Sequence, residues 1–199
     1  MLEKAYLLES TSKMDKARNA SVWIEQGYSL FAEEGLDGIQ IERLARILQL
    51  NKSGFYHYFG DLEGYCEEIV KLHHRKVDYF LQDVGKVNRV DPDYLLVLVK
   101  HAPTVMAQVQ CTRHNDSQSF YQVSEVVDRK LNLAIQQLWS DYLGVTNPDL
   151  VVRYFSIIRD MFYTRISFKN LNYPFLYNMA TEARQLVAQL ISITNCRKL

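Results

Sequence analysis

Cysteine and proline are scarce in this chain, with 3 Cys and 4 Pro among 199 residues. Cys66, Cys111 and Cys196 are odd in number and far apart, and no CxxC pair or Cys/His cluster has metal-ligand spacing. A disulfide framework or a zinc site would require such spacing. We therefore expect reduced, mainly structural cysteines, no metal and no cofactor, in a cytoplasmic protein.

Net charge and long apolar segments are absent as well. The chain holds 23 basic and 23 acidic residues, so its overall field favours neither nucleic acid nor an anionic membrane. No segment reaches the ~20 consecutive apolar residues of a transmembrane helix. The N-terminus, acidic from Glu3, does not resemble a signal peptide. We expect a globular cytoplasmic protein that has no membrane partner.

No strand pattern longer than a few residues is present, and apolar residues recur at helical spacing throughout. Gly35 and Gly144 favour helix C-termini, whereas Asn51, Asp91-Pro92 and Asn147-Pro148 favour N-termini. The sequence predicts an all-α fold of about nine helices, preceded by a loose arm or short extra helix over residues 1–18. The expected helices cover 20–34, 41–48, 52–58, 61–84, a stretch from 92 that kinks or restarts at Pro103, 117–143, 148–169 and 173–193.

The segment from Gly35 to Phe59 has the pattern of two short helices joined by a tight turn. Its apolar residues suit the small core that fixes such helices at a steep angle: Leu44, Ala45, Leu48, Leu50 and Phe55. The second helix begins with short, polar side chains, which lets its first turn approach base edges in a DNA major groove. The sequence therefore predicts a helix-turn-helix.

Three stretches here resemble the TetR family of transcriptional regulators: Leu30-Phe31-Ala32-Glu33-Glu34-Gly35, Ile41-x-x-Leu44-Ala45 and Lys52-Ser53-Gly54-Phe55-Tyr56-His57-Tyr58-Phe59. The resemblance covers residues 22–65. It implies an arm and helix-turn-helix DNA-binding domain in residues 1–60, and a larger helical effector-binding and dimerisation domain in residues 61–199. It also places the following residues at or near double-stranded DNA: Gln40, Lys52, Ser53, Gly54, Tyr56, His57 and Tyr58. We add Arg43 as a DNA-contacting cation, with Lys16, Arg18 and Arg46 as further sources of positive charge.

The match departs from the family pattern where charge matters. Gln49 stands at a turn position that is usually Gly, where a left-handed backbone costs a non-glycine residue roughly 1 kcal/mol or more. Leu62 replaces a common basic residue, and Glu42 stands where many members have Arg. Residues 1–63 hold seven basic and ten acidic side chains, a net of −3. We predict modest non-specific DNA binding with a shallow salt dependence.

The resemblance further implies a homodimer in which the last two helices of each chain form a four-helix bundle. Two-fold pairing would space the DNA-binding domains ~34–36 Å apart, or a multiple of it, on a palindromic operator. Packing inside one chain is the competing role for the residues expected at this seam, which are Tyr154, Ile158, Met179, Ala183, Leu186 and Leu190.

Family members usually bind a small molecule among the middle helices, and we expect an unknown effector to release a repressor from DNA in this way. The long helix over 61–84 is the expected lever between the cavity and the DNA-binding domain. Core packing is again the competing role for the candidate lining residues: His101, Met106, Phe120, Tyr121, Trp139, Tyr142, Phe162 and Tyr163.

The sequence leaves two other functions to consider, a helical dimer that does not rely on DNA and an enzyme. A TetR-like helical dimer with weakened or lost DNA binding, acting through protein contacts, would fit the acidic N-terminal region. An enzyme is not expected, because no nucleophile–base pair, Gly-rich phosphate loop or metal constellation is visible. His73 and His74 point about 100° apart on a helix, and we interpret both as surface residues.

Overall fold

The computed structural model describes residues 19–114 and 118–196, with side chains up to residue 192. Within these ranges the fold is all-α, with nine helices and no strand, as predicted. The arm or helix expected over residues 1–18 lies outside the described residues. After a first helix over residues 19–34, the elements are η1 (Gly35–Gly38), α2 (Ile41–Leu48), α3 (Lys52–Phe59), α4 (Leu62–Val84), η2 (Val90–Tyr94), α5 (Leu95–Lys100), α6 (Ala102–Arg113), α7 (Gln118–Leu143), α8 (Pro148–Arg165) and α9 (Tyr173–Cys196).

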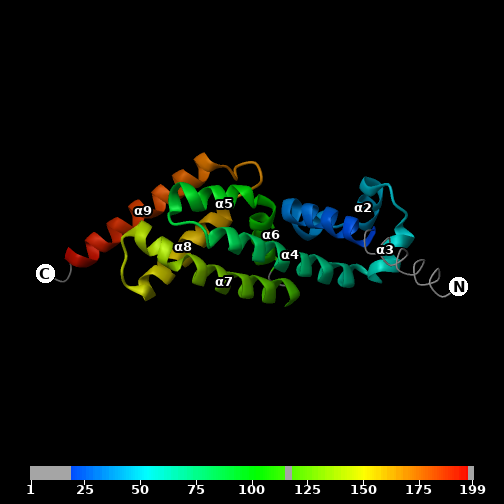
Figure 1. Cartoon of the computed structure of the whole chain (residues 1–199), viewed down its shortest axis with the longest axis horizontal. Helices are drawn as coiled ribbons and strands as arrows, with labels where there is room; N and C mark the ends of the chain where they lie inside the picture. The colour runs from blue at the N-terminus through cyan, green and yellow to red at the C-terminus, as the bar shows by residue number, and fades with distance from the viewer. Residues whose placement is uncertain (1–18, 115–117, 197–199) are drawn as a thin grey trace, which may run out of the picture.

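The molecule is elongated, with the helix-turn-helix at one end and the C-terminal part of α9 at the other (Figure 1). We call residues 19–60 the head and residues 61–196 the body. Helix α4 begins beside α3 and runs into the body, where it packs along α7. None of the described helices has both the length and the apolar character needed to cross a membrane.

Side-chain caps start three helices, two of them at the predicted residues Asn51 and Asn147 and one at Asp61. The Asn51 carboxamide accepts a hydrogen bond from Ser53 N at 3.0 Å at the start of α3. The Asp61 carboxylate does the same for Gly64 N at 2.8 Å at the start of α4. Asn147 caps α8 in the same way. Each cap satisfies an amide that has no partner within its own helix.

The predicted end of α8 is wrong, because the helix stops at Arg165 rather than near Lys169. The Asn170 side chain accepts from Ser167 N at 2.7 Å and donates to Arg165 O at 2.8 Å. This local loop satisfies polar backbone groups that would otherwise continue the helix. Asn side chains compete with helical hydrogen bonds in this way, and apolar periodicity gives no warning of it.

The head is held together by an aromatic cluster around Phe55, which is fully buried. The Phe55 ring lies 5.5 Å from the ring of Trp23, 5.1 Å from Phe59 and 4.9 Å from Tyr65. The Tyr65 hydroxyl also donates to Trp23 O at 2.5 Å. The first helix, α3 and the start of α4 are therefore fixed to one another.

The rest of the predicted helix-turn-helix core is confirmed in part. Leu44 and Ala45 are buried and Leu48 is partly buried. Leu50 is 39% exposed, which corrects its assignment to the core. It follows the turn at Gln49, where the backbone leaves α2 and no longer carries side chains toward that face.

Gln49 ends α2 in the left-handed conformation, with φ 55° and ψ 37°. The Leu50 amide bonds back to Ala45 O at 3.0 Å, which closes the helix end. The resemblance to the TetR family predicts this left-handed conformation, because the turn position is usually Gly. The conformation is strained at a non-glycine residue such as Gln49.

Replacing Gln49 with Gly should therefore raise the free energy of unfolding by up to ~1 kcal/mol, less the added entropy of the unfolded chain. Gln49→Val should lower it, because β-branched residues tolerate positive φ poorly. Urea denaturation followed by circular dichroism measures both changes.

A matched control is Gln82→Gly in α4, where an exposed Gln has helical backbone. There, Gly should destabilise by about 1 kcal/mol. If Gly has the same sign of effect at both positions, strain at Gln49 is not the cause.

Candidate functional site

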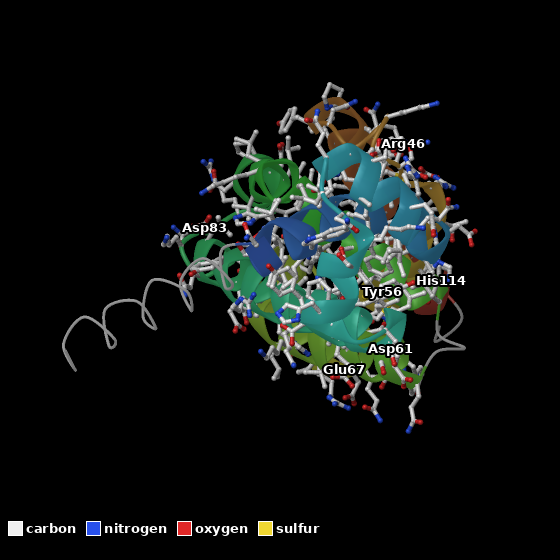
Figure 2. The ribbon with its side chains drawn as sticks, turned by 90° about the vertical axis from the view of Figure 1, so that its right-hand side faces the viewer. Arg46, Tyr56, Asp61, Glu67, Asp83 and His114 are labelled. Atoms are coloured by element: carbon white, nitrogen blue, oxygen red, sulfur yellow. The ribbon has the colours of Figure 1, made fainter. Side chains whose placement is uncertain are left out.

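Helix α3 presents a polar face to solvent while Phe55 anchors its opposite face. Lys52, Ser53, Tyr56 and His57 are exposed. Figure 2 looks at this end of the molecule and shows Tyr56 of α3 on the surface facing the viewer. Of the other residues predicted at DNA, Gln40 is exposed, whereas Arg43, Gly54 and Tyr58 are partly buried. The structure thus brings the predicted residues together on α2, α3 and the residue before α2.

Two of the cations on this face are already paired with carboxylates. Arg43 forms two contacts with Glu34, at 2.5 and 2.6 Å. Lys52 Nζ lies 2.9 Å from Glu42 Oε1. The same contacts lower the pKa of both carboxyl groups. Glu42 therefore neutralises the lysine that the family resemblance places at DNA.

Arg46 differs from these two cations. It is exposed at the same end of the molecule (Figure 2), and no ion pair joins it to another described residue. Lys16 and Arg18, which we expected to add positive charge, lie outside the described residues. Among described side chains, Arg46 is thus the cation of this face that remains available for a phosphate.

The head contacts the body through apolar packing and through the C-terminal end of α6. Phe31 stacks on Phe120 of α7 with ring centroids 4.9 Å apart. Gly35, at φ +73°, lies so close to His114 that an added Cβ would be 2.5 Å from the imidazole Nε2. The Leu36 amide donates to the same nitrogen at 3.4 Å. A movement of α6 would therefore act directly on Gly35 and Leu36 in the head.

A chain of buried polar contacts also links head and body. The Tyr28 hydroxyl lies 2.9 Å from His73 Nδ1, and His73 Nε2 lies 3.0 Å from Gln108 Oε1. Gln108 Nε2 in turn donates to Asp128 Oδ1 at 3.0 Å. Since an amide oxygen only accepts, His73 donates a hydrogen bond from Nε2, and the Nδ1 of the neutral ring accepts a hydrogen bond from the Tyr28 hydroxyl. The donors then all point from the head toward the Asp128 carboxylate.

His73 corrects our interpretation of the His73-His74 pair as surface residues. Its side chain is 1% exposed, whereas His74 is partly buried at the surface. The burial lowers the pKa of His73 from 6.5 to about 4. The imidazole is therefore neutral at physiological pH, as the hydrogen-bond chain requires.

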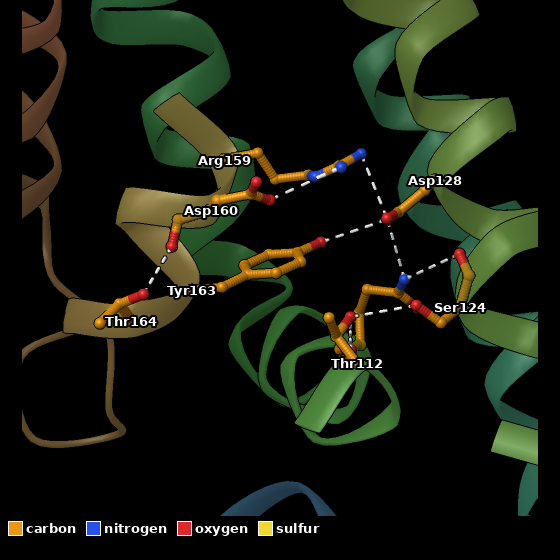
Figure 3. Close-up of polar contacts among 8 residues, drawn as sticks. Thr112, Ser124, Asp128, Arg159, Asp160, Tyr163 and Thr164 are labelled. Carbon is orange, nitrogen blue, oxygen red and sulfur yellow. Dashed lines mark hydrogen bonds and ion pairs between the residues drawn. The ribbon is translucent and has the colours of Figure 1, made fainter. Parts of the chain in front are cut away.

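Asp128 on α7 is where this chain ends (Figure 3). Its carboxylate lies 3.1 Å from Arg159 Nη1 and accepts a hydrogen bond from the Tyr163 hydroxyl at 3.4 Å. Burial raises the pKa of Asp128, and the Arg159 guanidinium opposes that rise. The anion thereby joins α6, α7 and α8 at one point.

Beside this point the body encloses a cavity of about 90 Å³. On this measure one water needs roughly 10–15 Å³, so the cavity is large enough for a small organic group. Its walls are mostly apolar, and the polar residues among them are Thr104, Gln108, Arg159 and Tyr163. Apolar walls with few polar groups are typical of small-molecule sites.

Three of the eight residues predicted to line an effector pocket do line this cavity, namely Trp139, Phe162 and Tyr163. The other five are not lining residues: His101 stands between α5 and α6, Phe120 and Tyr121 lie near the start of α7, and Met106 and Tyr142 belong to helices that line the cavity through other residues. His101 pairs with Asp83 at 2.9 Å, and Phe120 stacks on Phe31. Met106 is buried in the core, whereas Tyr121 is exposed. Tyr142 packs edge-to-face with Trp139 and is not part of the lining.

The residues predicted at the dimer seam divide between two environments. Ile158 and Met179 line the cavity and Ala183 is fully buried, so these three pack within one chain. Tyr154 is partly buried, and Leu186 and Leu190 are exposed. The prediction of a seam therefore rests on the exposed members.

Sequence reasoning missed two polar residues that line the cavity, Gln108 and Arg159, and the carboxylate that both of them contact, Asp128. One signal was present, since Arg159 follows Phe155 and Ile158 on an otherwise apolar face of α8. Among the residues described, no group of three or more His, Cys, Asp or Glu side chains is placed to hold a metal ion.

Comparison with known proteins agrees with the geometry of the head. Residues 24–64 match the family described as bacterial regulatory proteins, tetR family. This confirms the resemblance to the TetR family in the helix-turn-helix region. No curated protein gives a significant match.

A solved structure has the same fold as this chain. It is the crystal structure of a transcriptional regulator (TerR/AcrR family) from Aquifex aeolicus VF5, with a TM-score of 0.51 and 20% sequence identity. The similarity covers 86% of this chain and 98% of that one. The fold is thus a helix-turn-helix domain followed by a larger helical domain, and together with the family match it supports a DNA-binding transcriptional regulator.

The burial of neutral His73 predicts a pH dependence of stability. Below about pH 6.5 the unfolded chain gains a proton that the folded chain does not bind until about pH 4. Folding stability should therefore fall by up to ~1.4 kcal/mol per pH unit as the pH decreases through this range. Urea denaturation at pH 7, 6 and 5 should show a smaller decrease for His73→Gln than for the unaltered chain.

The same substitution at the neighbouring His74, which is nearer the surface, serves as the control and should retain the pH dependence. Equal slopes for His73→Gln and the unaltered chain would contradict the assignment of a neutral buried imidazole.

Proposed function

We propose that this protein is a transcriptional repressor that binds a palindromic operator as a homodimer and is released by a small-molecule effector. The observation that carries the proposal is the exposed N-terminal face of α3 in a helix-turn-helix that matches the TetR family. Fold alone does not define function, and it is this surface together with the cavity that supports the proposal.

Recognition of the DNA sequence would use the first two turns of α3. Ser53 and Gly54 carry no bulky side chain, so the start of the helix can approach the groove closely. The Tyr56 hydroxyl and the helix N-terminal amides suit phosphate oxygens. His57 and Gln40 offer groups that hydrogen-bond to base edges or phosphates.

A stripe on α8 supports a dimer. Leu150, Tyr154, Ile157 and Met161 follow one another at spacings of four, three and four residues, which places them along one side of the helix. Leu150 is 37% exposed and Ile157 63% exposed, whereas the neighbouring Ile158 faces the cavity. On α9, which packs against α8, Leu186 and Leu190 are exposed as well. An exposed apolar stripe on adjacent helices suits a second copy of the same surface.

Effector control would use the connection between cavity and head. Arg159 and Tyr163 line the cavity and hold Asp128, from which the polar chain continues through Gln108 and His73 to the first helix. A ligand that displaces Arg159 would disturb this chain. Effects of 1–3 kcal/mol between sites are typical of such coupling.

The DNA-binding proposal predicts opposite effects of the two partners in the Glu42–Lys52 pair. Selection of binding sequences from random duplexes should yield two inverted half-sites separated by one or more helical turns. On the selected duplex, Lys52→Ala should weaken binding, and Glu42→Gln should strengthen it several-fold by removing a negative charge that opposes phosphate. Gel shifts at several salt concentrations measure both effects.

Asp78→Asn is the matched control, because it removes one carboxylate from an ion pair with Lys130 at 2.9 Å in the body. It should leave the affinity unchanged. If no sequence is enriched at moderate salt, the DNA-binding proposal fails, and the alternative of a helical dimer that acts through protein contacts takes its place. The pairing of both Arg43 and Lys52 with carboxylates is the observation in favour of that alternative.

The dimer proposal predicts that Ile157→Glu will convert the protein to a monomer, because it places two charges in an apolar two-fold seam. Light scattering coupled to size-exclusion chromatography measures the mass. The control is Leu133→Glu, since Leu133 is 79% exposed on α7, outside the two seam helices. A dimeric Ile157→Glu variant, or a monomeric Leu133→Glu variant, would place the interface elsewhere.

A further inference from the structure

The cavity of the body offers a mainly apolar surface to a molecule that enters it. Every helix from α4 to α9 contributes aliphatic or aromatic side chains to the lining, among them Phe80, Leu98, Trp139, Ile158 and Leu176. A buried water needs two to four polar partners, so this surface suits an organic molecule better than a cluster of waters. An engineered apolar cavity of roughly 150 Å³ in another protein takes up benzene. The cavity here, at about 90 Å³, is of the same order.

Two polar side chains of the lining, Gln108 and Tyr163, direct their polar atoms to other protein groups. Gln108 Oε1 accepts a hydrogen bond from His73 at 3.0 Å. Gln108 Nε2 donates to Asp128 Oδ1 at 3.0 Å and to Ser124 O at 3.3 Å. The Tyr163 hydroxyl donates to the same Asp128 oxygen at 3.4 Å. A ligand could bond to these groups only at the expense of this network.

The remaining polar groups of the lining side chains add little. The Thr104 hydroxyl is hydrogen-bonded to Tyr28. Trp139 Nε1 and Arg159 Nε have no partner among the described residues, but both have almost no accessible surface, so a molecule in the cavity does not reach them. At most, the uncharged hydroxyl of Tyr94 is left for a polar contact with a ligand.

The lining has no free charge of either sign. Arg159 is the single charged side chain among the described lining residues. Its guanidinium lies 3.1 Å from Asp128 Oδ2 and 3.7 Å from Asp160 Oδ1 (Figure 3). An anionic ligand would have to separate Arg159 from Asp128, and a cationic ligand would find no carboxylate among the described lining residues. A charge buried without a partner is costly, so both kinds of ion are disfavoured.

We propose that the cavity binds an uncharged, mainly apolar molecule about the size of a single substituted ring. This inference rests on the proposed function, because it names the chemical class of the effector. Apolar contact supplies the affinity, and the lack of an available counter-ion excludes charged compounds. The ligand would displace Arg159 through its bulk rather than through a bond to the guanidinium.

Three probes with the same ring and nearly the same size test the ligand class: toluene, benzoate and benzylammonium. Isothermal titration of the full chain, without DNA, measures their affinities. We expect toluene to bind at least about tenfold more tightly than either ion, because only toluene enters the cavity without burying an unpaired charge.

One variant tests whether toluene binds in this cavity. Ala180 lines it on α9, and Ala180→Leu fills part of the space, so toluene binding should weaken about tenfold or more. Ala134→Leu makes the same change at an exposed position of α7 and should leave the affinity unchanged. If Ala180→Leu does not fold, Ala180→Val fills less space and should weaken binding several-fold.

A second variant tests the reason for the exclusion of anions. Asp128→Asn keeps the shape of the side chain and removes the charge that competes for Arg159. Benzoate should then bind several-fold more tightly than to the unaltered chain, whereas toluene binding should change little. Circular dichroism checks that the variant is folded.

Four results would overturn the inference: no binding of toluene up to its solubility limit, tighter binding of either ion than of toluene, equal toluene affinities in the folded Ala180 and Ala134 variants, or no gain of benzoate binding in folded Asp128→Asn. Failure of the proposed function is distinguishable from these. A chain that binds its selected duplex but not toluene refutes the ligand class, and a chain that binds toluene but no duplex refutes the function.

Discussion

The partly buried carboxylate of Asp128 is the constraint on which the rest of the body depends. A buried anion is costly unless it is paired and hydrogen-bonded on all sides. Its partners Arg159, Gln108 and Tyr163 come from two other helices, α6 and α8. Apolar packing alone would let these helices slide by small steps at little cost. The directed contacts to one carboxylate fix their relative positions.

The same carboxylate makes the head and the cavity interdependent. Gln108 is held on one side by Asp128 and on the other by His73, which is itself bonded to Tyr28 in the head. A change at Arg159 would leave the partly buried anion of Asp128 without its cation, so the surrounding contacts must rearrange together rather than relax locally. A network that must rearrange as a unit is the kind of two-state element that carries coupling between distant sites.

The sequence predicted several parts of the structure that depend on local chemistry, although it missed the local loop at Asn170 that ends α8. The caps at Asn51 and Asn147 and the left-handed turn at Gln49 each depend on residues within a few positions of one another. The features that the sequence did not predict depend on rotation about a helix axis. His73 is buried while the neighbouring His74 is only partly buried, and Ile157 is exposed while the neighbouring Ile158 is buried. Apolar spacing does not resolve one residue, or 100°, in a helix that is apolar on several sides.

The acidic character of the head bears on how the proposed repressor would switch. Because Glu34 and Glu42 neutralise Arg43 and Lys52, one head gains little from phosphate attraction, and most of its affinity must come from contacts at base edges. If each head binds DNA weakly, a stable complex forms only when both heads of a dimer bind at once, because linkage of the two heads raises the overall affinity. A small change in the distance between heads then removes one head's contacts and with them most of the binding. In the proposed repressor, low positive charge would thus increase the sensitivity of DNA release to an effector bound in the body.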